Sequence, residues 1–187
     1  DGIRDKLVTG VQSALPISAR GAQDYDGLLN LAADASTIEV GHLQIDPFAV
    51  PHDALEPLQL TCTDGARRLG VLTDLGHAPP AVLASLQGCH ALLLECNHEP
   101  DMLERSAYPP LLKRRVGGDH GHLANAQAAD ILGSLRHEQL GEVVAAHLSR
   151  KNNLPGLARA ALAGALGRQP ADVLVADATE GTGWIRV

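Results

Sequence analysis

The stretch PLQLTCTDGARRLGVLTD, residues 57–74, decides the fold of this chain. Apolar residues alternate or run together on either side of an Asp-Gly pair at positions 64 and 65, which is typical of a β-hairpin and its turn. The second run ends on Asp74, so a carboxylate directly follows a buried strand. The stretch therefore predicts an antiparallel pair whose second strand leads into a candidate functional residue.

The flanking sequence extends this pattern into a layered fold. Residues 37–40 and 43–50 predict a first hairpin with Gly41 at its turn. Further along, the patterns predict helices at 79–88, 125–137 and 155–167 and strands at 90–96, 142–148, 172–176 and 183–187. Asn125 stands where an N-cap is expected, residues 97–124 are expected to form a polar loop, and residues 1–36 are weakly patterned. Hairpins followed by strand–helix–strand alternation predict an α/β layered fold.

Composition and charge argue against several classes of protein. Of the 187 residues, 45% are hydrophobic and 20% charged, so the chain is long and apolar enough for one domain with a buried core. Only 2% are aromatic, which makes a stacking platform for single-stranded nucleic acid improbable. The net charge of −7 argues against broad electrostatic binding to DNA or anionic membranes, but it is compatible with a local basic groove.

The cysteines and the apolar runs predict where in the cell the protein is located. Cys62, Cys89 and Cys96 stand in apolar surroundings without a CxxC pair, which favours reduced, buried thiols in a cytosolic protein. No apolar run approaches membrane-spanning length, and no signal peptide is recognisable. We therefore expect a cytoplasmic protein that does not associate with membranes.

Polar side chains follow the predicted strands where those strands end. They are His52 and Asp53, then Asp74, then Asn97, His98 and Glu99, and finally His147. Ligands bind at the carboxyl ends of strands in layered α/β folds. Any one of these residues alone is equally well explained by a turn, a helix cap or a solvated hydrogen bond. Four successive strand ends with a histidine or an aspartate together predict a site for a divalent cation such as zinc or manganese.

Five stretches in a particular order add a family resemblance. They are VPHDALEP, GVLTDLG, LLLECNHEPDML, GDHGHLAN and AHLSRKNNLP, and they extend from Val50 to Pro155. Together they resemble the metallo-β-lactamase fold hydrolases and, within that superfamily, the YycJ (WalJ)-like branch of phosphodiesterases and nucleases. The resemblance implies an αββα sandwich with a dinuclear metal site at one edge of its two sheets.

The resemblance also implies a set of metal ligands. His52 corresponds to the ligand after the early hairpin, Asp74 to the carboxylate that bridges two metal ions, and His147 to the last ligand. Two divalent ions, zinc or manganese, are therefore expected in the complete protein, where they would activate a shared hydroxide. For this reason Asp74 is expected to be catalytic as well as a ligand.

His122 is the second residue that the resemblance assigns to catalysis. It lies in GGDHGHLAN, residues 117–125, and matches a histidine of related phosphodiesterases that precedes a helix and contacts the scissile phosphate. A protonated imidazole there can stabilise charge on the phosphate oxygens and donate a proton to the leaving oxygen. Asp119 and His120, although close in sequence, match no ligand position and are expected to be loop residues.

Substrate binding is expected from residues around these ligands. The candidates are Asn97, His98, Ser149 and Asn152. Ser149 and Asn152 could equally cap the helix that begins at Pro155. The basic run at residues 113–115, with Arg150 and Lys151, is a candidate rim for a phosphodiester backbone, although most charge runs are simply solvated.

One defining motif of the superfamily is absent. The His-x-His-x-Asp-His motif should precede His52 and supply most of the ligands, yet neither residues 1–10 nor residues 21–30 contain it. The chain also starts at Asp1 rather than at a methionine. We therefore expect residues 1–187 to be a single metallo-β-lactamase-like domain without its N-terminal strands, as a fragment of a longer domain. The alternative is a natural loss of half of the site, and in either case the remaining ligands would bind one metal ion weakly.

These expectations converge on a metal-dependent hydrolase of phosphodiesters, with a 5′-to-3′ DNA exonuclease as the specific case that the branch suggests. A small-molecule cyclic phosphodiesterase or an esterase is the alternative within hydrolases, because the acidic net charge and the few aromatic residues leave it open. A catalytically inactive module of the same fold, with a role in assembly or regulation, is the alternative from another class. The missing ligand motif keeps that alternative open.

Overall fold

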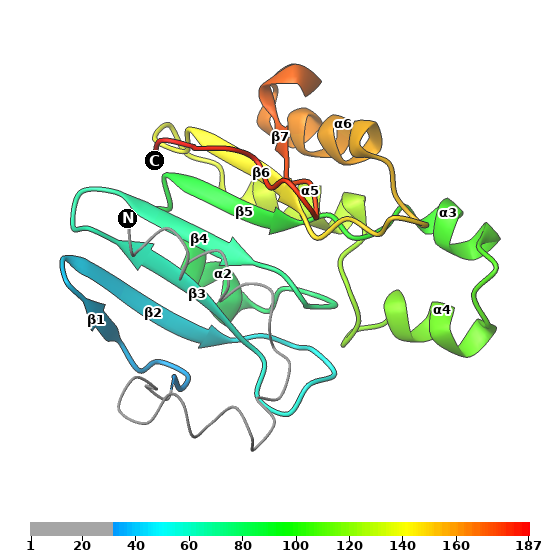
Figure 1. Ribbon diagram of the computed structural model, residues 1–187, viewed down its shortest axis with the longest axis horizontal. Helices are drawn as coiled ribbons and strands as arrows, with labels where there is room; N and C mark the ends of the chain where they lie inside the picture. Colours follow the sequence, from blue (N-terminus) through cyan, green and yellow to red (C-terminus); the bar gives the residue numbers. More distant parts are fainter. Residues whose placement is uncertain (1–31) are drawn as a thin grey trace. The chain divides into compact units, whose positions relative to one another are not determined.

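A mixed β-sheet is the framework of the protein. The computed structural model describes residues 32–187, and within them the strands form one seven-stranded sheet whose spatial order follows the chain (Figure 1). The strands are β1 (Ile38–Val40), β2 (Leu43–Ala49), β3 (Leu58–Thr63), β4 (Arg68–Leu72), β5 (Ala91–Glu95), β6 (Glu142–Ala146) and β7 (Leu174–Val175). Neighbours from β1 to β4 are antiparallel, whereas neighbours from β4 to β7 are parallel.

The antiparallel half consists of two hairpins, as the apolar patterns predict. β1 pairs with β2, and β3 pairs with β4. At the two turns, Gly41 and Gly65 have φ angles of 64° and 90°. Residues that have a side chain rarely adopt such φ angles, so the glycines allow the chain to reverse direction between the strands. Both predicted hairpins are confirmed.

Three helices pack against one face of the sheet, with the main hydrophobic core between the two layers (Figure 1). They are α2 (Pro80–Leu86), α5 (Asn125–Leu135) and α6 (Pro155–Leu166). Leu72, Leu94 and Ala145 are neighbours across β4, β5 and β6 and belong to this core. Burial of each large aliphatic side chain contributes about 1.5–3 kcal/mol. Because side chains alternate along a strand, the next residues, Glu95 and Ala146, point to the opposite face.

The stretch between β5 and α5 differs from its prediction. Residues 97–124 were expected to form a polar loop, but they contain two helices, α3 (Pro100–Arg105) and α4 (Pro110–Val116). Each begins on a proline, whose fixed φ suits the first turn of a helix. Their apolar face is too small to give a helical pattern, because α3 buries Leu103 alone and α4 buries no residue.

Two smaller predictions are also wrong. Residues 183–187 form no strand and follow a tight turn in which Asp177 and Gly181 bridge, and Gly183 has a φ of 73°. The N-cap of α5 is Ala124, and the side chain of Asn125 instead donates hydrogen bonds to Glu99 and Asn153. The segments inspected for the missing metal motif, and most of the weakly patterned residues 1–36, lie outside the described residues.

The cysteines behave as expected from their surroundings. Cys89 and Cys96 are buried and Cys62 is half-buried, and all three are free. Burial raises the pKa of the Cys96 thiol to about 12, so this thiol stays protonated and unreactive. In residues 32–187, no helix has both the length and the hydropathy that a membrane crossing requires.

Candidate metal centre

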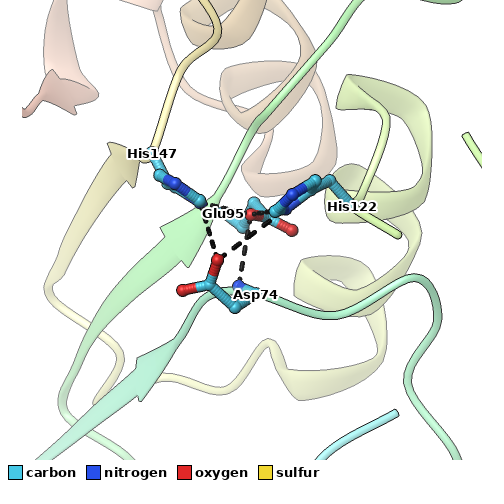
Figure 2. Close-up of side chains that lie close together, drawn as sticks. All are labelled: Asp74, Glu95, His122 and His147. Carbon is cyan, nitrogen blue, oxygen red and sulfur yellow. Dashed lines mark hydrogen bonds and ion pairs between the residues drawn. The ribbon is translucent and has the colours of Figure 1, made fainter. Parts of the chain in front are cut away.

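Four side chains that could hold a metal ion meet at one edge of the sheet. Asp74 follows β4, Glu95 is the last residue of β5, and His147 follows β6. His122 comes from the loop before α5 (Figure 2). One ligand atom from each of the four lies within 4.8 Å of the others. The parallel arrangement of β4, β5 and β6 places their carboxyl ends together, as the sequence predicts.

Glu95 lies at the base of this cluster and is fully buried. Its Oε1 atom is 3.0 Å from Nδ1 of His122 and 2.6 Å from Nδ1 of His147. The same carboxylate accepts the backbone N–H groups of Asp74 at 3.2 Å and Leu123 at 2.9 Å. Burial alone would raise the pKa of Glu95, but the hydrogen bonds from the two imidazoles outweigh it and lower the pKa to about 2. Glu95 is therefore an ionised carboxylate that fixes the orientation of both rings.

The backbone at two of the four residues is in an unfavourable conformation. Asp74 has a φ of 56° and His147 a φ of 54°, in the left-handed region that few residues other than glycine adopt. Such conformations persist where the surrounding structure enforces them, and they cluster at functional sites. Asp74 Oδ1 consequently lies 3.5 Å from His147 Nδ1 and 3.9 Å from His122 Nδ1.

His147 is the imidazole most strongly affected by this arrangement. Its hydrogen bond to Glu95 raises its pKa, although burial opposes the change, and the charges of Glu95 and Asp74 add to the increase. Asn97 holds the backbone of the same residue, because its Nδ2 donates a hydrogen bond to the His147 carbonyl at 3.1 Å. The position of His147 is therefore held through both its ring and its backbone.

His52 lies at the side of the cluster and has the tautomer of a metal ligand. Its Nδ1 is 3.0 Å from the carbonyl oxygen of Gly121, which can only accept a hydrogen bond, so Nδ1 carries the proton. In the neutral ring Nε2 then keeps its lone pair, and this atom lies 3.5 Å from Asp53 Oδ1 and 3.9 Å from Asp74 Oδ1. The ring centroids of His52 and His147 lie 5.1 Å and 5.2 Å from that of His122, which stands between them.

The loop that carries His122 is packed tightly against its neighbours. A side chain at Gly121 would place its Cβ 2.1 Å from the Arg115 carbonyl oxygen, and one at Gly76 would place it 2.3 Å from the backbone of Asp119. The carbonyl oxygen of Asp119 is 2.9 Å from Nδ1 of His77, so Asp119 meets its neighbours through backbone. Asp119 and His120 do not join the cluster of candidate ligands, in line with their prediction as loop residues.

A cavity of about 300 Å³ opens above these residues. It is lined by His52, Asp53, Asp74, Leu112, Arg115, Val116, Gly121, His122 and His147. All predicted metal ligands and both predicted catalytic residues are in this set. The structure thus places His52, Asp74, His122 and His147 around one cavity.

The expected substrate-binding residues lie elsewhere. Asn97, His98 and Asn152 are 8%, 4% and 1% exposed, respectively. Ser149 is half-buried, and its hydroxyl accepts the backbone N–H of Asn152 at 3.2 Å. None of these four residues lines the cavity. Their role in substrate binding stays a prediction.

Glu95 is the functional residue that the sequence reasoning missed. In ALLLE (Ala91–Glu95) it ends an apolar strand, and the polar residues after the strand, Asn97 to Glu99, drew the attention instead. A charged residue within a fully buried strand is itself a signal, because a charge is rarely buried without partners. The combined donors, imidazole nitrogens and carboxylate oxygens, fit zinc or manganese.

Comparisons with known proteins agree with this geometry. No family model matches the chain. The chain is 34% identical over 119 residues to the exodeoxyribonuclease YycJ of Bacillus anthracis, and the match covers 64% of this chain and 45% of that protein. The chain therefore spans less than half the length of this relative.

Solved structures show the same fold. The metallo-β-lactamase fold protein YhfI of Bacillus subtilis superimposes with a TM-score of 0.59 and 15% identity, over 87% of this chain and 59% of that one. Zn²⁺-bound PqqB of Methylobacterium extorquens follows with a TM-score of 0.55 and 21% identity, over 79% of this chain and 49% of that one. The chain has the metallo-β-lactamase fold and is similar in sequence to the YycJ protein.

Proposed function

We propose that the chain carries part of the active site of a metal-dependent hydrolase of phosphodiesters, with a 5′-to-3′ DNA exonuclease as the specific case. The observation that carries the proposal is the buried Glu95 carboxylate, which holds two imidazoles beside Asp74 at the carboxyl edge of the sheet. The similarity to a protein named exodeoxyribonuclease, YycJ of B. anthracis, supports DNA as the substrate. Cleavage of a phosphodiester then requires an activated nucleophile and a proton for the leaving oxygen.

Asp74, His52 and His147 are the residues that would hold the metal. His52 presents Nε2, and Asp74 presents a carboxylate that is 42% exposed at the cavity. Two divalent ions in the complete protein, zinc or manganese, belong to this proposal, and the zinc in PqqB supports it. Bound there, a divalent ion would lower the pKa of a water molecule toward neutrality. Glu95 keeps His147 in place for this role by fixing its Nδ1.

His122 would supply the proton. Its Nδ1 is bonded to Glu95, and its Nε2 has no partner among residues 32–187. In its protonated form the ring could stabilise charge on a phosphate oxygen and protonate the leaving oxygen. The same nitrogen could alternatively bind a metal ion, because His122 lies within the cluster of candidate ligands.

Metal content of the full-length protein tests the proposal. We expect about two transition-metal ions per chain after purification without chelators, and a marked loss in Asp74→Asn. Asparagine tolerates the φ of 56° at this position, so the variant should remain folded. A freshly purified full-length protein without bound metal would contradict the proposal.

The role of His122 needs a separate variant. In His122→Ala, we expect turnover of a 5′-phosphorylated oligonucleotide to fall by about 100-fold or more while the metal content is retained. Loss of metal from this variant would instead make His122 a ligand. Inductively coupled plasma mass spectrometry alongside the nuclease assay separates the two roles.

Two broader predictions accompany this function. We propose that residues 1–187 are part of one longer metallo-β-lactamase-like domain, in agreement with the 45% coverage of YycJ. We also propose a cytoplasmic location, which the free and largely buried cysteines support.

A further inference from the structure

We infer that Arg115 binds a phosphate group of the substrate and that Asp53 positions its guanidinium for this contact. The inference rests on the proposed function, because it concerns how the same site recognises its substrate. Arg115 lies in the last turn of α4 and lines the cavity together with Asp74 and His122. Neither its place in the cavity nor its partner follows from the basic run at residues 113–115 alone.

The ion pair between the two residues uses Nε of Arg115 and leaves the two terminal amino groups of the guanidinium available for a ligand. Nε of Arg115 donates a hydrogen bond to Oδ2 of Asp53. The two terminal amino groups have no partner within residues 32–187. Their N–H groups form a planar fork that matches two oxygens of a phosphate. The guanidinium of Arg115 is charged at neutral pH, as arginine side chains are throughout proteins.

The charges around the cavity require such a residue if the ligand is an anion. Asp53 and Asp74 both line the cavity and are negative. Arg115 is the one lysine or arginine side chain among the residues that line it. The carboxylates repel a phosphodiester that approaches Asp74, and a fixed positive charge beside them would add to the charge of the metal ions that the site is proposed to hold. Arg115 supplies that charge at the mouth of the cavity, where its side chain is 67% exposed.

Backbone contacts keep Arg115 at a fixed place relative to His122. The N–H of His122 donates to the Val116 carbonyl at 2.8 Å, and the N–H of Asp53 donates to the His120 carbonyl at 3.0 Å. The close approach of Gly121 to the Arg115 carbonyl allows no side chain between them. A phosphate held by Arg115 would therefore stand in a constant relation to the imidazole that acts on the scissile bond.

The remaining walls indicate what is attached to the phosphate. Leu112 and Val116 lie on the same helix as Arg115 and line the same cavity, which measures about 300 Å³. Apolar surface beside a phosphate-binding group suits the sugar and base of a nucleotide. The ligand class is thus a nucleoside phosphate, as at the end of a DNA chain.

The test measures binding of thymidine 5′-monophosphate to the full-length, metal-loaded protein by isothermal titration calorimetry. Arg115→Gln should weaken binding by about 10- to 100-fold, because a charge-assisted, bidentate contact is lost. Arg115→Lys, which keeps the charge without the fork, should fall between this variant and the unmodified protein. Asp53→Asn should weaken binding less than Arg115→Gln does, because the guanidinium is still present.

Two controls isolate the contact. Arg105→Gln removes the same charge from the neighbouring helix α3, at a residue that is 82% exposed and does not line the cavity, and it should leave the affinity within about 2-fold, because exposed charges are largely screened. Thymidine without its phosphate should bind the unmodified protein and Arg115→Gln equally. The metal content of each variant, measured in parallel, shows whether the proposed hydrolase site itself is intact.

Three results would overturn the inference. The first is equal affinity of the unmodified protein and Arg115→Gln for the nucleotide, including no binding by either. The second is an equal loss in Asp53→Asn and Arg115→Gln with equal falls in melting temperature, which would make the pair a structural tether. The third is an equal loss in Arg105→Gln. A protein without metal in which Arg115→Gln still weakens nucleotide binding would refute the proposed hydrolase while it supports Arg115 as a phosphate-binding residue.

Discussion

The two halves of the sheet contribute to the candidate site in different ways. In the parallel half, β4, β5 and β6 all end at the same edge and deliver Asp74, Glu95 and His147. In the antiparallel half, successive strands end at opposite edges, so from there only the segment after β2 brings His52 and Asp53 to the cavity. Strand direction therefore lets three strands of the parallel half contribute to the site, whereas the antiparallel half contributes through one segment.

The polar residues of the two halves also differ in their surroundings. Glu95 is fully buried and accepts hydrogen bonds from four groups, two rings and two backbone amides. Asp46, in the middle of β2, accepts from the side chains of Thr37 and Gln44 near the surface. Removal of a buried carboxylate leaves its hydrogen-bond partners unsatisfied, so it lowers stability more than removal of an exposed carboxylate does. Stability and site geometry should therefore be coupled in the parallel half and separate in the antiparallel half.

The largest expected effect is that of Glu95→Ala. Removal of this carboxylate leaves two buried backbone N–H groups and two imidazoles without their acceptor, which should lower the free energy of unfolding by about 4 kcal/mol. The matched change in the other half, Asp46→Ala, should lower it by less than about 1 kcal/mol. Urea unfolding of the full-length protein with chelator present measures both. Equal effects would mean that the parallel half has no special dependence on its carboxylate.

Acid titration isolates the same carboxylate without deleting it. Its pKa is about 2 in the folded protein and about 4.5 in its ordinary state. A lowered pKa contributes stability that is present above pH 4.5 and lost as the pH falls toward 2. Between these values the unmodified protein should lose about 3 kcal/mol more than Glu95→Gln, which has no proton to gain. Parallel curves for the two proteins in chelator-containing urea titrations would contradict the prediction.

Metal affinity should distinguish the two histidines that the halves contribute. His147 contacts both Glu95 and Asp74, whereas His52 approaches Asp74 only to 3.9 Å. We expect His147→Asn to weaken zinc binding by about 100-fold and His52→Asn by about 10-fold, because the better-oriented ligand contributes more. Asparagine tolerates the φ of 54° at position 147, so the variant tests the ligand rather than the backbone. Competition with a chromophoric chelator gives both affinities, and a larger loss at His52 would place the centre of the site in the antiparallel half.

The sequence was sufficient to predict the seven strands of the sheet and the residues at their ends, although it also predicted a strand at 183–187 that does not form. Asp74, His147 and His52 follow apolar runs whose pattern is local, and the direction of the strands then brings them together. The family resemblance added His122, which the structure places among them. These predictions rest on periodicity and chain order, which do not depend on details of packing.

What could not be predicted depends on tertiary contacts. Glu95 contacts His122 and His147, which lie 27 and 52 positions further along the chain. Asn97, His98 and Asn152 follow strands or ligands as expected, yet packing buries them away from the cavity. Helix α4 buries none of its residues and so gives no apolar pattern, and for that reason the position of Arg115 in the cavity could not be predicted.

The smallest expected effect concerns backbone conformation on the edge away from the site. Gly65 has a φ of 90° at the hairpin turn, and a Cβ there would meet no atom within 4 Å among the described residues. Gly65→Ala should therefore reduce the free energy of unfolding by about 1 kcal/mol through backbone strain alone, and zinc affinity should not change. Asp74 and His147 have the same kind of backbone conformation, but there it directs candidate ligands toward one another. A change in zinc affinity in Gly65→Ala would show that strain in the antiparallel half reaches the site, and that the two halves are not independent.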